Sequence, residues 1–413
     1  MNRHNALQER LSTGEFTEEQ KKNLENLFNQ EEARTLKRMR TRSKVDQYER
    51  LKLIGRGGYG EVWLVYDHTS SEICALKILN KAKIIMDDQV ANVRAERNLL
   101  AMSDKKESSQ WIVDLKASFQ DDQFLYLVME FVPGGDMLTL LIKFNTFPLK
   151  IATFYTAEII AAVNSVHNLG FIHRDIKPDN ILIAQNGHIK LTDFGCSKKY
   201  TKQESQLTKL LDQLHDMIME DSDIYQRRNH NNNTVNHKRQ NAVSIDYAAP
   251  EILAGKRPTK ATDYWSVGVI LYEMLYGYPP FASNSTHDTY IRILHWPQNL
   301  KFYPKKNVSR DAIDLMQNLI CYEDKRFTYE QIIAHPFFQG FNFDNPTSVS
   351  PPLIPSLQSP VDTSHFENIM PEANGSCDFN TENELTQFAF LGFTYNKKPC
   401  SKVLSDLGVF TSA

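Results

Sequence analysis

The hydrophobic pattern of this chain changes period once, at the Pro-Gly-Gly of residues 133–135. Before this point, over residues 48–132, short apolar or alternating runs typical of strands surround one helical stretch at residues 88–103. After it, to about residue 340, apolar residues recur at helical spacing, as in residues 263–277. The pattern predicts an α+β, bilobal fold with a small lobe, built on an antiparallel sheet with one main helix, and a larger helical lobe.

Residues 1–47 are a predicted helical extension before the small lobe. Thr17 and Gln20 make a capping box, and apolar residues at 24–28 follow at helical spacing. We therefore expect a helix from Thr17 to about Arg42, and its second half is a basic run.

Two other regions are polar. Residues 200–240, within the larger lobe of residues 133–340, are rich in asparagine, and residues 341–413 form a tail rich in proline and serine that ends in a short aromatic cluster. We expect neither region to contribute to a core.

The composition excludes several classes of protein. With 413 residues, 41% of them hydrophobic, the chain can fold around a sizeable core. Its net charge of -3 gives no overall reason to expect nucleic acid or an anionic membrane as a partner. No stretch looks like a signal peptide or a membrane span, and the five cysteines are scattered, so we expect reduced thiols and a location in the cytoplasm or nucleus.

The strongest chemical signal is a pair of motifs in the larger lobe, HRDIKPDN at residues 173–180 and DFG at residues 193–195. The alternative, a set of solvated loop charges, would have to reproduce both motifs, their order and their spacing by accident.

The residue types in these motifs suit phosphoryl transfer, which asks the protein to place a hydroxyl and to screen phosphate charge. Asp175 can accept the proton of a hydroxyl group, and Lys177 can screen the γ-phosphate. Asn180 and Asp193 carry the hard oxygen ligands that Mg²⁺ prefers.

The small lobe carries a glycine-rich run at residues 55–62, whose backbone amides could donate to phosphates. A glycine-rich hairpin and a dinucleotide fingerprint are the alternatives, but the latter needs a helix next, and here a strand pattern follows. Lys77 ends an apolar strand and could be an edge charge that extends to water. Glu96, in the helical stretch, is placed to pair with Lys77 and hold it on the α- and β-phosphates.

With these motifs, residues from about Tyr48 to Phe338 resemble a eukaryotic protein kinase domain. Further matches are Ala249-Pro250-Glu251, Asp263-Tyr264-Trp265, Gly268 and Arg326. The resemblance implies a serine/threonine protein kinase that uses ATP and Mg²⁺, in which Glu251 and Arg326 form a buried ion pair and Asp263 braces the catalytic loop. The nucleotide-binding positions it implies are Ile54, Gly55, Gly57, Gly60, Val62, Ala75, Lys77, Met129, Glu130, Val132, Leu182 and Asp193.

The tail narrows the resemblance to the AGC group. The run FLGFTY at residues 390–395 resembles the AGC hydrophobic motif, in which two aromatics, here Phe390 and Phe393, dock beside the glutamate-bearing helix. Phosphorylation of Thr394 by an upstream kinase would strengthen that docking. Residues 352–355 and 362–366 resemble the other anchoring segments of such tails, whereas the alternative is merely an adhesive tail.

Within that group the chain resembles the NDR/LATS branch, and in some phrases the fungal mitotic-exit and septation kinases. The similar features are the basic helix KRMRTRSK, the phrases VRAERNLL, CALKILNK and MEFVPGGD, the insert after DFG, and His295-Trp296. The resemblance implies that residues from about Thr17 to Lys44 dock a Mob-family adaptor, the alternative being a solvated helix packed on the small lobe. It also implies a role in the cell cycle, cytokinesis or morphogenesis, with a spindle pole or the division site as an expected location.

Three acidic residues, Asp136, Asp179 and Glu273, match the positions by which AGC kinases bind arginine upstream of the phosphorylated residue. Each could equally be an ordinary surface carboxylate, but together they predict a preference for serine or threonine in a basic context.

The activation segment departs from the family pattern. Ser244 can replace the usual threonine that bonds the catalytic aspartate and lysine, but the phosphorylated position falls within residues 240–242, which read Gln-Asn-Ala. Arg174 would then lack its usual anionic partner. We hypothesise that the enzyme depends on the adaptor and on Thr394 instead of loop phosphorylation. The alternative functions are a weak or inactive scaffold that binds a Mob-type adaptor and a small-molecule phosphotransferase.

Overall fold

The computed structural model describes residues 3–12, 16–40, 43–103, 110–200, 245–369, 389–397 and 407; for Arg3 and residues 34–40 it describes only the backbone. The chain divides into two compact units, Met1–Phe131 with Glu367–Ala413, and Val132–Phe366. The predicted α+β bilobal kinase fold is confirmed, because the first unit is built on an antiparallel sheet and the second is mainly helical.

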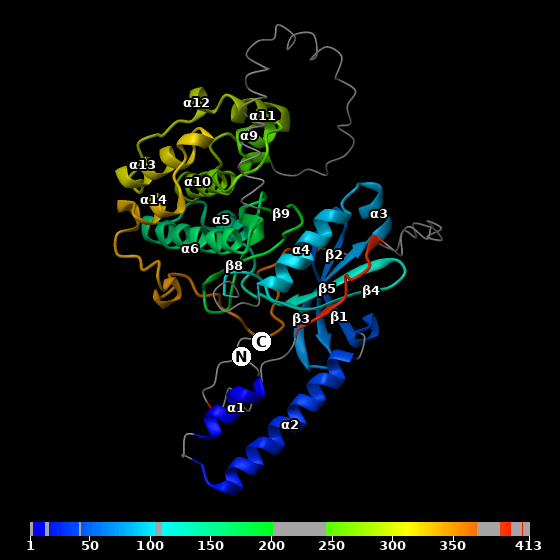
Figure 1. Cartoon of the computed structure of the whole chain (residues 1–413). Coiled ribbons are helices and arrows are strands. Elements are labelled where there is room, and N and C mark those ends of the chain that lie inside the picture. The colour runs from blue at the N-terminus through cyan, green and yellow to red at the C-terminus, as the bar shows by residue number, and fades with distance from the viewer. Residues whose placement is uncertain are drawn as a thin grey trace. The chain divides into compact units, whose positions relative to one another are not determined.

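The first unit contains a six-stranded sheet in the order β1-β2-β3-β5-β4-β10, and every neighbouring pair is antiparallel (Figure 1). The strands are β1 (Tyr48–Gly57), β2 (Gly60–Asp67), β3 (Glu72–Asn80), β4 (Leu115–Gln120), β5 (Phe124–Glu130) and β10 (Tyr395–Asn396). The helices are α1 (Arg3–Leu11), α2 (Glu18–Arg40), α3 (Lys81–Met86) and α4 (Val90–Met102), with the short η1 (Val45–Gln47). Tyr48, Phe119 and Tyr126 stack in succession within one core cluster of this sheet.

The N-terminal extension is a pair of helices, of which the sequence predicted only α2. Its capping box is confirmed, since the Thr17 amide donates to the Gln20 side chain at 2.9 Å and the Gln20 amide donates to the Thr17 hydroxyl at 3.3 Å. Leu7 and Leu11 of α1 bury Phe28 of α2 in a cluster of their own. Burial against α1 therefore adds to propensity in holding α2 in place.

The tail contributes to the core of the first unit, so the expectation that residues 341–413 would build no core is wrong at two positions. The side chains of Phe390 and Phe393 are 0% and 1% exposed. Tyr395 pairs with Ser118, and thus β10 extends the sheet beyond β4. The large apolar area of two aromatic rings outweighs the polar character of the segment around them.

The second unit is organised around two largely buried helices, α6 and α10. Its helices are α5 (Met137–Phe144), α6 (Leu149–Asn168), α9 (Pro250–Leu253), α10 (Lys260–Tyr276), α11 (Thr286–Leu294), α12 (Trp296–Asn299), α13 (Arg310–Leu319) and α14 (Tyr329–Ile333). Short strands form two antiparallel two-stranded sheets, β6 (Phe171–Ile172) with β9 (Lys198–Lys199), and the hairpin of β7 (Ile181–Ile183) with β8 (Ile189–Leu191). The single-turn helices are η2 (Pro178–Asn180), η3 (Ile245–Tyr247), η4 (Glu323–Lys325), η5 (Pro336–Phe338) and η6 (Pro346–Ser348).

The first part of the tail packs against the second unit where that unit has glycine residues. A Cβ on Gly187 would lie 2.3 Å from the Leu353 carbonyl oxygen, and one on Gly135 would lie 2.4 Å from the His365 carbonyl oxygen. Because only glycine permits such close backbone approach, these contacts agree with the predicted anchoring segments. The tail is thus divided at Phe366, with its later residues in the first unit.

Residues 201–244, which hold the polar insert apart from Tyr200 and also hold Ser244, lie outside the described residues. Among the residues that the structure does describe, no helix has both the length and the apolar character needed to cross a membrane.

Candidate active site

The HRD motif lies between β6 and η2 and brings three predicted catalytic residues together. The Lys177 ammonium donates to Asp175 Oδ2 at 2.9 Å, and the Asn180 amide nitrogen donates to the same oxygen at 3.0 Å and to the Asp175 carbonyl at 2.8 Å. Asp175 is therefore held by two donors from its own loop, which leaves a carboxylate oriented to accept a proton.

Asp263 of α10 braces this loop, as predicted. Its carboxylate accepts the backbone amides of His173 at 3.0 Å and Arg174 at 2.8 Å, and it is fully buried. Burial by itself would raise the pKa of Asp263, but hydrogen bonds, the largest from His167, outweigh it and the pKa lies below its usual value. An ionised buried carboxylate can thus stabilise Arg174 at a positive φ of 69°.

A hairpin positions the two predicted metal ligands. Asn180 directly precedes β7, Asp193 follows β8 by two residues, and Ile181 pairs with Leu191. The Thr192 amide also donates to the Asn180 carbonyl at 3.0 Å, which joins the two ends.

The donor chemistry of this pair fits a hard divalent cation. The Asn180 amide nitrogen is engaged with Asp175, so the amide oxygen is the atom oriented for an outside ligand. No group of three or more His, Cys, Asp and Glu side chains in the described part of the chain could hold a metal ion alone. Mg²⁺ commonly takes only one or two protein ligands, with phosphate and water completing its shell.

The glycine-rich run forms the connection between β1 and β2. A Cβ on Gly60 would lie 1.7 Å from the Ile78 carbonyl oxygen, so the sheet itself requires glycine there. Gly57 has nothing within 4 Å of such a Cβ, and Gly55 meets only Val62 at 3.4 Å. The absent side chains at Gly55 and Gly57 are consequently not explained by packing, whereas close approach of a ligand to the backbone would explain them.

The predicted pair of Lys77 and Glu96 is confirmed. Lys77 of β3 donates to Glu96 Oε1 of α4 at 2.7 Å, and Glu96 is only 2% exposed. Lys77 is cross-strand partner to Val62, which in turn pairs with Gly55. Lys77, Val62 and Gly55 therefore lie side by side on three neighbouring strands, which places the charged pair next to the glycine-rich run.

The remaining positions predicted to bind nucleotide lie on strands of the first unit or, for two of them, in the second unit. Ala75 of β3 and Met129 of β5 are direct cross-strand partners, so their side chains lie on the same face of the sheet. Lys77 is two residues after Ala75 on β3, and its side chain therefore lies on that face as well. Ile54 is on β1 and Glu130 ends β5, whereas Val132 and Leu182 belong to the second unit. The backbone of Asp136 forms a bridge with Leu182 in that unit.

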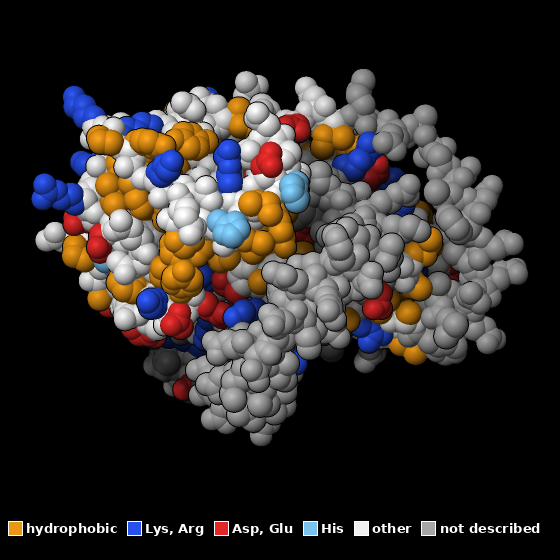
Figure 2. Space-filling model, turned by 90° about the horizontal axis from the view of Figure 1, so that it is seen from above, with side chains coloured by type: hydrophobic (Ala, Val, Ile, Leu, Met, Phe, Trp, Pro, Cys, Tyr) orange, Lys and Arg blue, Asp and Glu red, His pale blue; other side chains and the backbone are white. Residues whose placement is uncertain are grey.

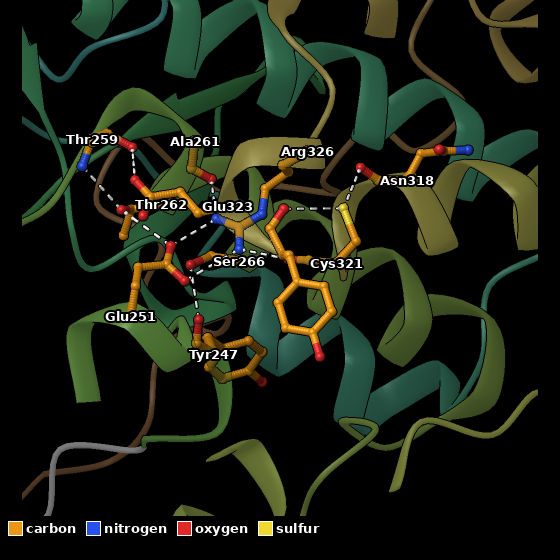
Figure 3. Close-up of polar contacts among 11 residues, drawn as sticks. Tyr247, Glu251, Thr259, Ala261, Thr262, Ser266, Asn318, Cys321, Glu323 and Arg326 are labelled. Atoms are coloured by element: carbon orange, nitrogen blue, oxygen red, sulfur yellow. Dashed lines mark hydrogen bonds and ion pairs between the residues drawn. The ribbon is translucent and has the colours of Figure 1, made fainter. Parts of the chain in front are cut away.

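The predicted ion pair of Glu251 and Arg326 is confirmed and has two bonds, at 2.7 and 3.2 Å (Figure 3). Arg326 also donates to the carbonyls of Ala261 at 2.8 Å and Cys321 at 2.9 Å, and its guanidinium lies 5.2 Å from the ring of Trp265. This network connects the end of the activation segment to α10 and η4, and its role is structural.

The three acidic residues predicted to bind substrate lie in different environments. Asp136 accepts the Thr139 amide at 2.7 Å and caps α5, and Asp179 is exposed on η2. Glu273 is 7% exposed and accepts a hydrogen bond from the Tyr247 hydroxyl at 2.5 Å. The alternative of an ordinary surface carboxylate is therefore wrong for Glu273.

Burial has an electrostatic consequence at Glu273. It raises the pKa of Glu273 to about 7, and the Tyr247 hydrogen bond opposes that rise. Asp246 and Asp179 add to the rise through their negative charge. Sequence reasoning missed the role of Tyr247, for which the only available signal was its place just before the APE motif.

The residues predicted to regulate the enzyme are Arg174, Thr394 and the hydrophobic motif. Arg174 donates to the Cys196 carbonyl, a neutral group, and burial lowers its pKa. Thr394 is exposed, directly after the buried Phe393. The predicted docking of the hydrophobic motif beside α4 is confirmed, because Arg94 of that helix donates to the carbonyls of Ala389 at 3.0 Å and Leu391 at 2.9 Å.

Arg97 is a second anchor that the sequence did not reveal. It donates to the Gly392 carbonyl at 2.6 Å, and its guanidinium lies 5.7 Å from the centre of the Phe393 ring. Burial and then the charge of Arg94 lower the pKa of Arg97, so two arginines repel each other next to the motif.

Comparison with known proteins agrees with this geometry. Residues 48–338 match the family described as "Protein kinase domain". The chain is 38% identical to serine/threonine-protein kinase CBK1 of Pneumocystis carinii, over 94% of this chain and 81% of that protein. It is 38% identical to the probable serine/threonine-protein kinase ndrB of Dictyostelium discoideum, over 94% and 76%. It is 37% identical to serine/threonine-protein kinase Warts of Drosophila melanogaster, over 96% of this chain and 37% of that protein.

Protein kinases use ATP and a divalent metal ion and act on protein substrates, and the residues predicted to be catalytic are all present in this chain. Since the domain match covers both units and the relatives align along nearly the whole chain, the chain belongs to the serine/threonine protein kinases of the NDR/LATS branch.

Proposed function

We propose that this kinase transfers the γ-phosphate of ATP to serine and threonine hydroxyls in basic segments of proteins, with Asp175 as the residue that accepts the hydroxyl proton. The observation that carries the proposal is the convergence of Lys177 and Asn180 on one oxygen of Asp175. The second oxygen of Asp175 is then the acceptor for the substrate, and Lys177 lies where it can screen the transferred phosphate.

The metal ion in this proposal is Mg²⁺, held by Asn180 and Asp193. Bound Mg²⁺ would neutralise phosphate charge during the transfer. The protein contributes the orientation of the two ligands through the β7–β8 hairpin. Lys77, held by Glu96, and the backbone of the glycine-rich run would bind the phosphates, and each of the other predicted nucleotide contacts belongs to the same proposal.

Substrate choice in this proposal depends on Asp136, Asp179 and Glu273, which would bind arginine upstream of the phosphorylated residue. Asp179 is exposed, and Glu273 and Asp136 are each oriented by a hydrogen bond within the second unit. Fixed carboxylates favour the planar, two-bonded recognition that arginine makes better than lysine. Ser244, outside the described residues, is proposed to contact the catalytic loop as the usual threonine does.

Regulation in this proposal acts through Thr394 and the N-terminal helices. A phosphate on Thr394, added by an upstream kinase, would place negative charge next to the arginines of α4, whose mutual repulsion it would relieve. The helices α1 and α2 would dock a Mob-family adaptor, to which the basic sequence at the end of α2 adds charge. We further propose a place in the cytoplasm or nucleus, at a spindle pole or the division site, and a role in the cell cycle, cytokinesis or morphogenesis.

The experiment that tests the proposal uses the purified full chain with MgATP and a serine peptide that carries arginine upstream, beside the variant Asp193→Ala. We expect phosphate transfer by the original chain and none by the variant. If the original chain transfers no phosphate even with a Mob adaptor, and the variant is folded and equally inactive, the protein would instead be a scaffold. No observation in the described residues favours that second function.

A further inference from the structure

The second unit carries a pocket that takes no part in the proposed transfer. It has a volume of about 680 Å³ and lies along the segment between α12 and the first turns of α13. Its apolar lining includes Tyr303, Val308 and Ile313, and the Tyr303 side chain is 54% exposed. Because aromatic residues are enriched in protein–protein interfaces, an exposed tyrosine beside an open cavity suits a surface that binds a partner.

The pocket is preformed, because the segment that lines it is fastened to the end of α10. The Tyr276 hydroxyl donates to the Tyr303 carbonyl at 3.2 Å, and the Tyr272 hydroxyl donates to the Lys301 carbonyl at 2.9 Å. Lys305 donates to the Leu275 carbonyl at 2.9 Å. A site already held open loses less conformational freedom when a ligand binds.

All the charged side chains that line the pocket are positive. Lys305, Lys306 and Arg310 line it, no acidic residue does, and all three are exposed. Within the described part of the chain none of the three belongs to an ion pair, and Lys305 donates to backbone carbonyls and lies over the ring of Tyr276. Asp311, in the first turn of α13, is the nearest acid in the sequence and is also exposed. The charged side chains that line the pocket are therefore all positive, which favours an acidic ligand.

Figure 2 shows the face that carries α11 and α12, where hydrophobic side chains lie among those of Lys and Arg. The pocket also combines apolar and basic side chains, and it could hold one side chain of a peptide. Nucleic acid would instead require an extended row of cations or several stacking aromatics, and the chain as a whole is slightly acidic.

We propose that this basic pocket binds an acidic segment of a protein substrate, with one aromatic or branched apolar side chain inserted between Tyr303 and Ile313. The carboxylates on either side of that anchor would face Lys306 and Arg310. The identification of the partner as a substrate rests on the proposed function, whereas the binding chemistry does not. Such a contact would recruit substrates through a site separate from Asp175 and would lower KM without altering kcat.

The binding test uses the full chain and a fluorescein-labelled peptide in which one Phe is flanked by three Asp or Glu on each side. Its matched probes replace Phe by Ala, or the acids by Lys. We expect saturable binding only with the first probe, and a dissociation constant raised about tenfold in Lys306→Glu/Arg310→Glu, because two rim charges are reversed. The control Lys150→Glu/Lys260→Glu changes the net charge equally at exposed sites of the same unit and should bind normally.

Three results would overturn the proposal: equal binding of the Ala probe, equal weakening by both double variants, or tighter binding of a single-stranded RNA of the same charge that the pocket variant abolishes. Hydrogen exchange adds a readout, since the probe should protect residues 302–313.

The kinetic arm separates this proposal from the proposed function. An arginine-containing serine peptide joined to the acidic segment should have a lower KM than the same peptide without it. The pocket variant should lose that advantage and retain its activity on the unjoined peptide. A chain that binds the probe but phosphorylates neither peptide supports the pocket and contradicts the proposed function.

Discussion

Lys77 Nζ lies 2.7 Å from Glu96 Oε1 in an environment where the glutamate is almost completely buried. Glu96→Gln keeps the shape of this pair but removes its charge. We expect kcat/KM for peptide phosphorylation to fall about 10- to 100-fold, as for loss of a charge-assisted hydrogen bond of about 1.5–3 kcal/mol. Steady-state kinetics with varied ATP would measure this effect.

The matched control for that change is Glu72→Gln. Glu72 also accepts a lysine, Lys116, at 2.6 Å, but its side chain is 56% exposed. Exposed pairs contribute little, so activity and stability should stay close to those of the original chain. Equal kinetics in the Glu96 and Glu72 variants would show that the buried pair does not support transfer.

The two ends of the glycine-rich run should respond differently to alanine. At Gly60 an added methyl group meets the Ile78 carbonyl at 1.7 Å, so Gly60→Ala should lower the free energy of unfolding by about 1–3 kcal/mol or more. At Gly57 the methyl group has nothing within 4 Å, so Gly57→Ala should melt normally and raise KM for ATP. Thermal unfolding and ATP titration of both variants test this. A reversed pattern would mean that Gly57 is structural.

Much of this site could be predicted from sequence because its chemistry is local. The HRD motif places Asp175, Lys177 and Asn180 within a few residues, so their convergence needs little of the fold. The pair of Lys77 and Glu96 needed only the correct assignment of one strand and one helix. In both cases residue type and spacing carried the information.

Contacts between distant segments were the part that could not be predicted. The packing of α1 against Phe28 and the arginine contacts to the tail depend on how separate elements meet. Glu273 shows the same limit, since the sequence also allowed an ordinary surface carboxylate there, yet the Glu273 side chain is buried and accepts a hydrogen bond from Tyr247 of η3. Burial of a polar residue by a remote element leaves no periodic signal in the sequence.

The hydrophobic motif should stabilise the first unit through its buried aromatics. Phe393 is 1% exposed, and its carbonyl accepts the Ser118 hydroxyl at 2.6 Å. Phe393→Ala should lower the free energy of unfolding by about 3–5 kcal/mol and reduce activity. Leu391, two residues away and 63% exposed, is the control, and Leu391→Ala should change neither. Calorimetry of the full chain with a parallel kinase assay would detect the difference, and matching losses in the two variants would count against docking through Phe393.

Recognition of arginine through Glu273 should depend on pH. Burial raises the pKa of Glu273 to about 7, so below that pH the folded enzyme carries a neutral acid there. Since only the carboxylate attracts a guanidinium, KM for the arginine peptide should fall as the pH rises through about 7 and then level off. A peptide with citrulline in place of arginine should lack this dependence, which separates Glu273 from other groups that titrate nearby.

The variant Tyr247→Phe provides an independent check on the pH dependence of KM for the arginine peptide. The Tyr247 hydroxyl donates to Glu273 at 2.5 Å and thereby lowers the pKa that burial has raised. Without that donor the carboxylate is less stable, so the fall in KM should move to higher pH. A shift to lower pH, or a profile identical for arginine and citrulline peptides, would show that the charge on Glu273 does not select the substrate. Such a result would leave the selection to Asp136 and Asp179, which are both more exposed than Glu273.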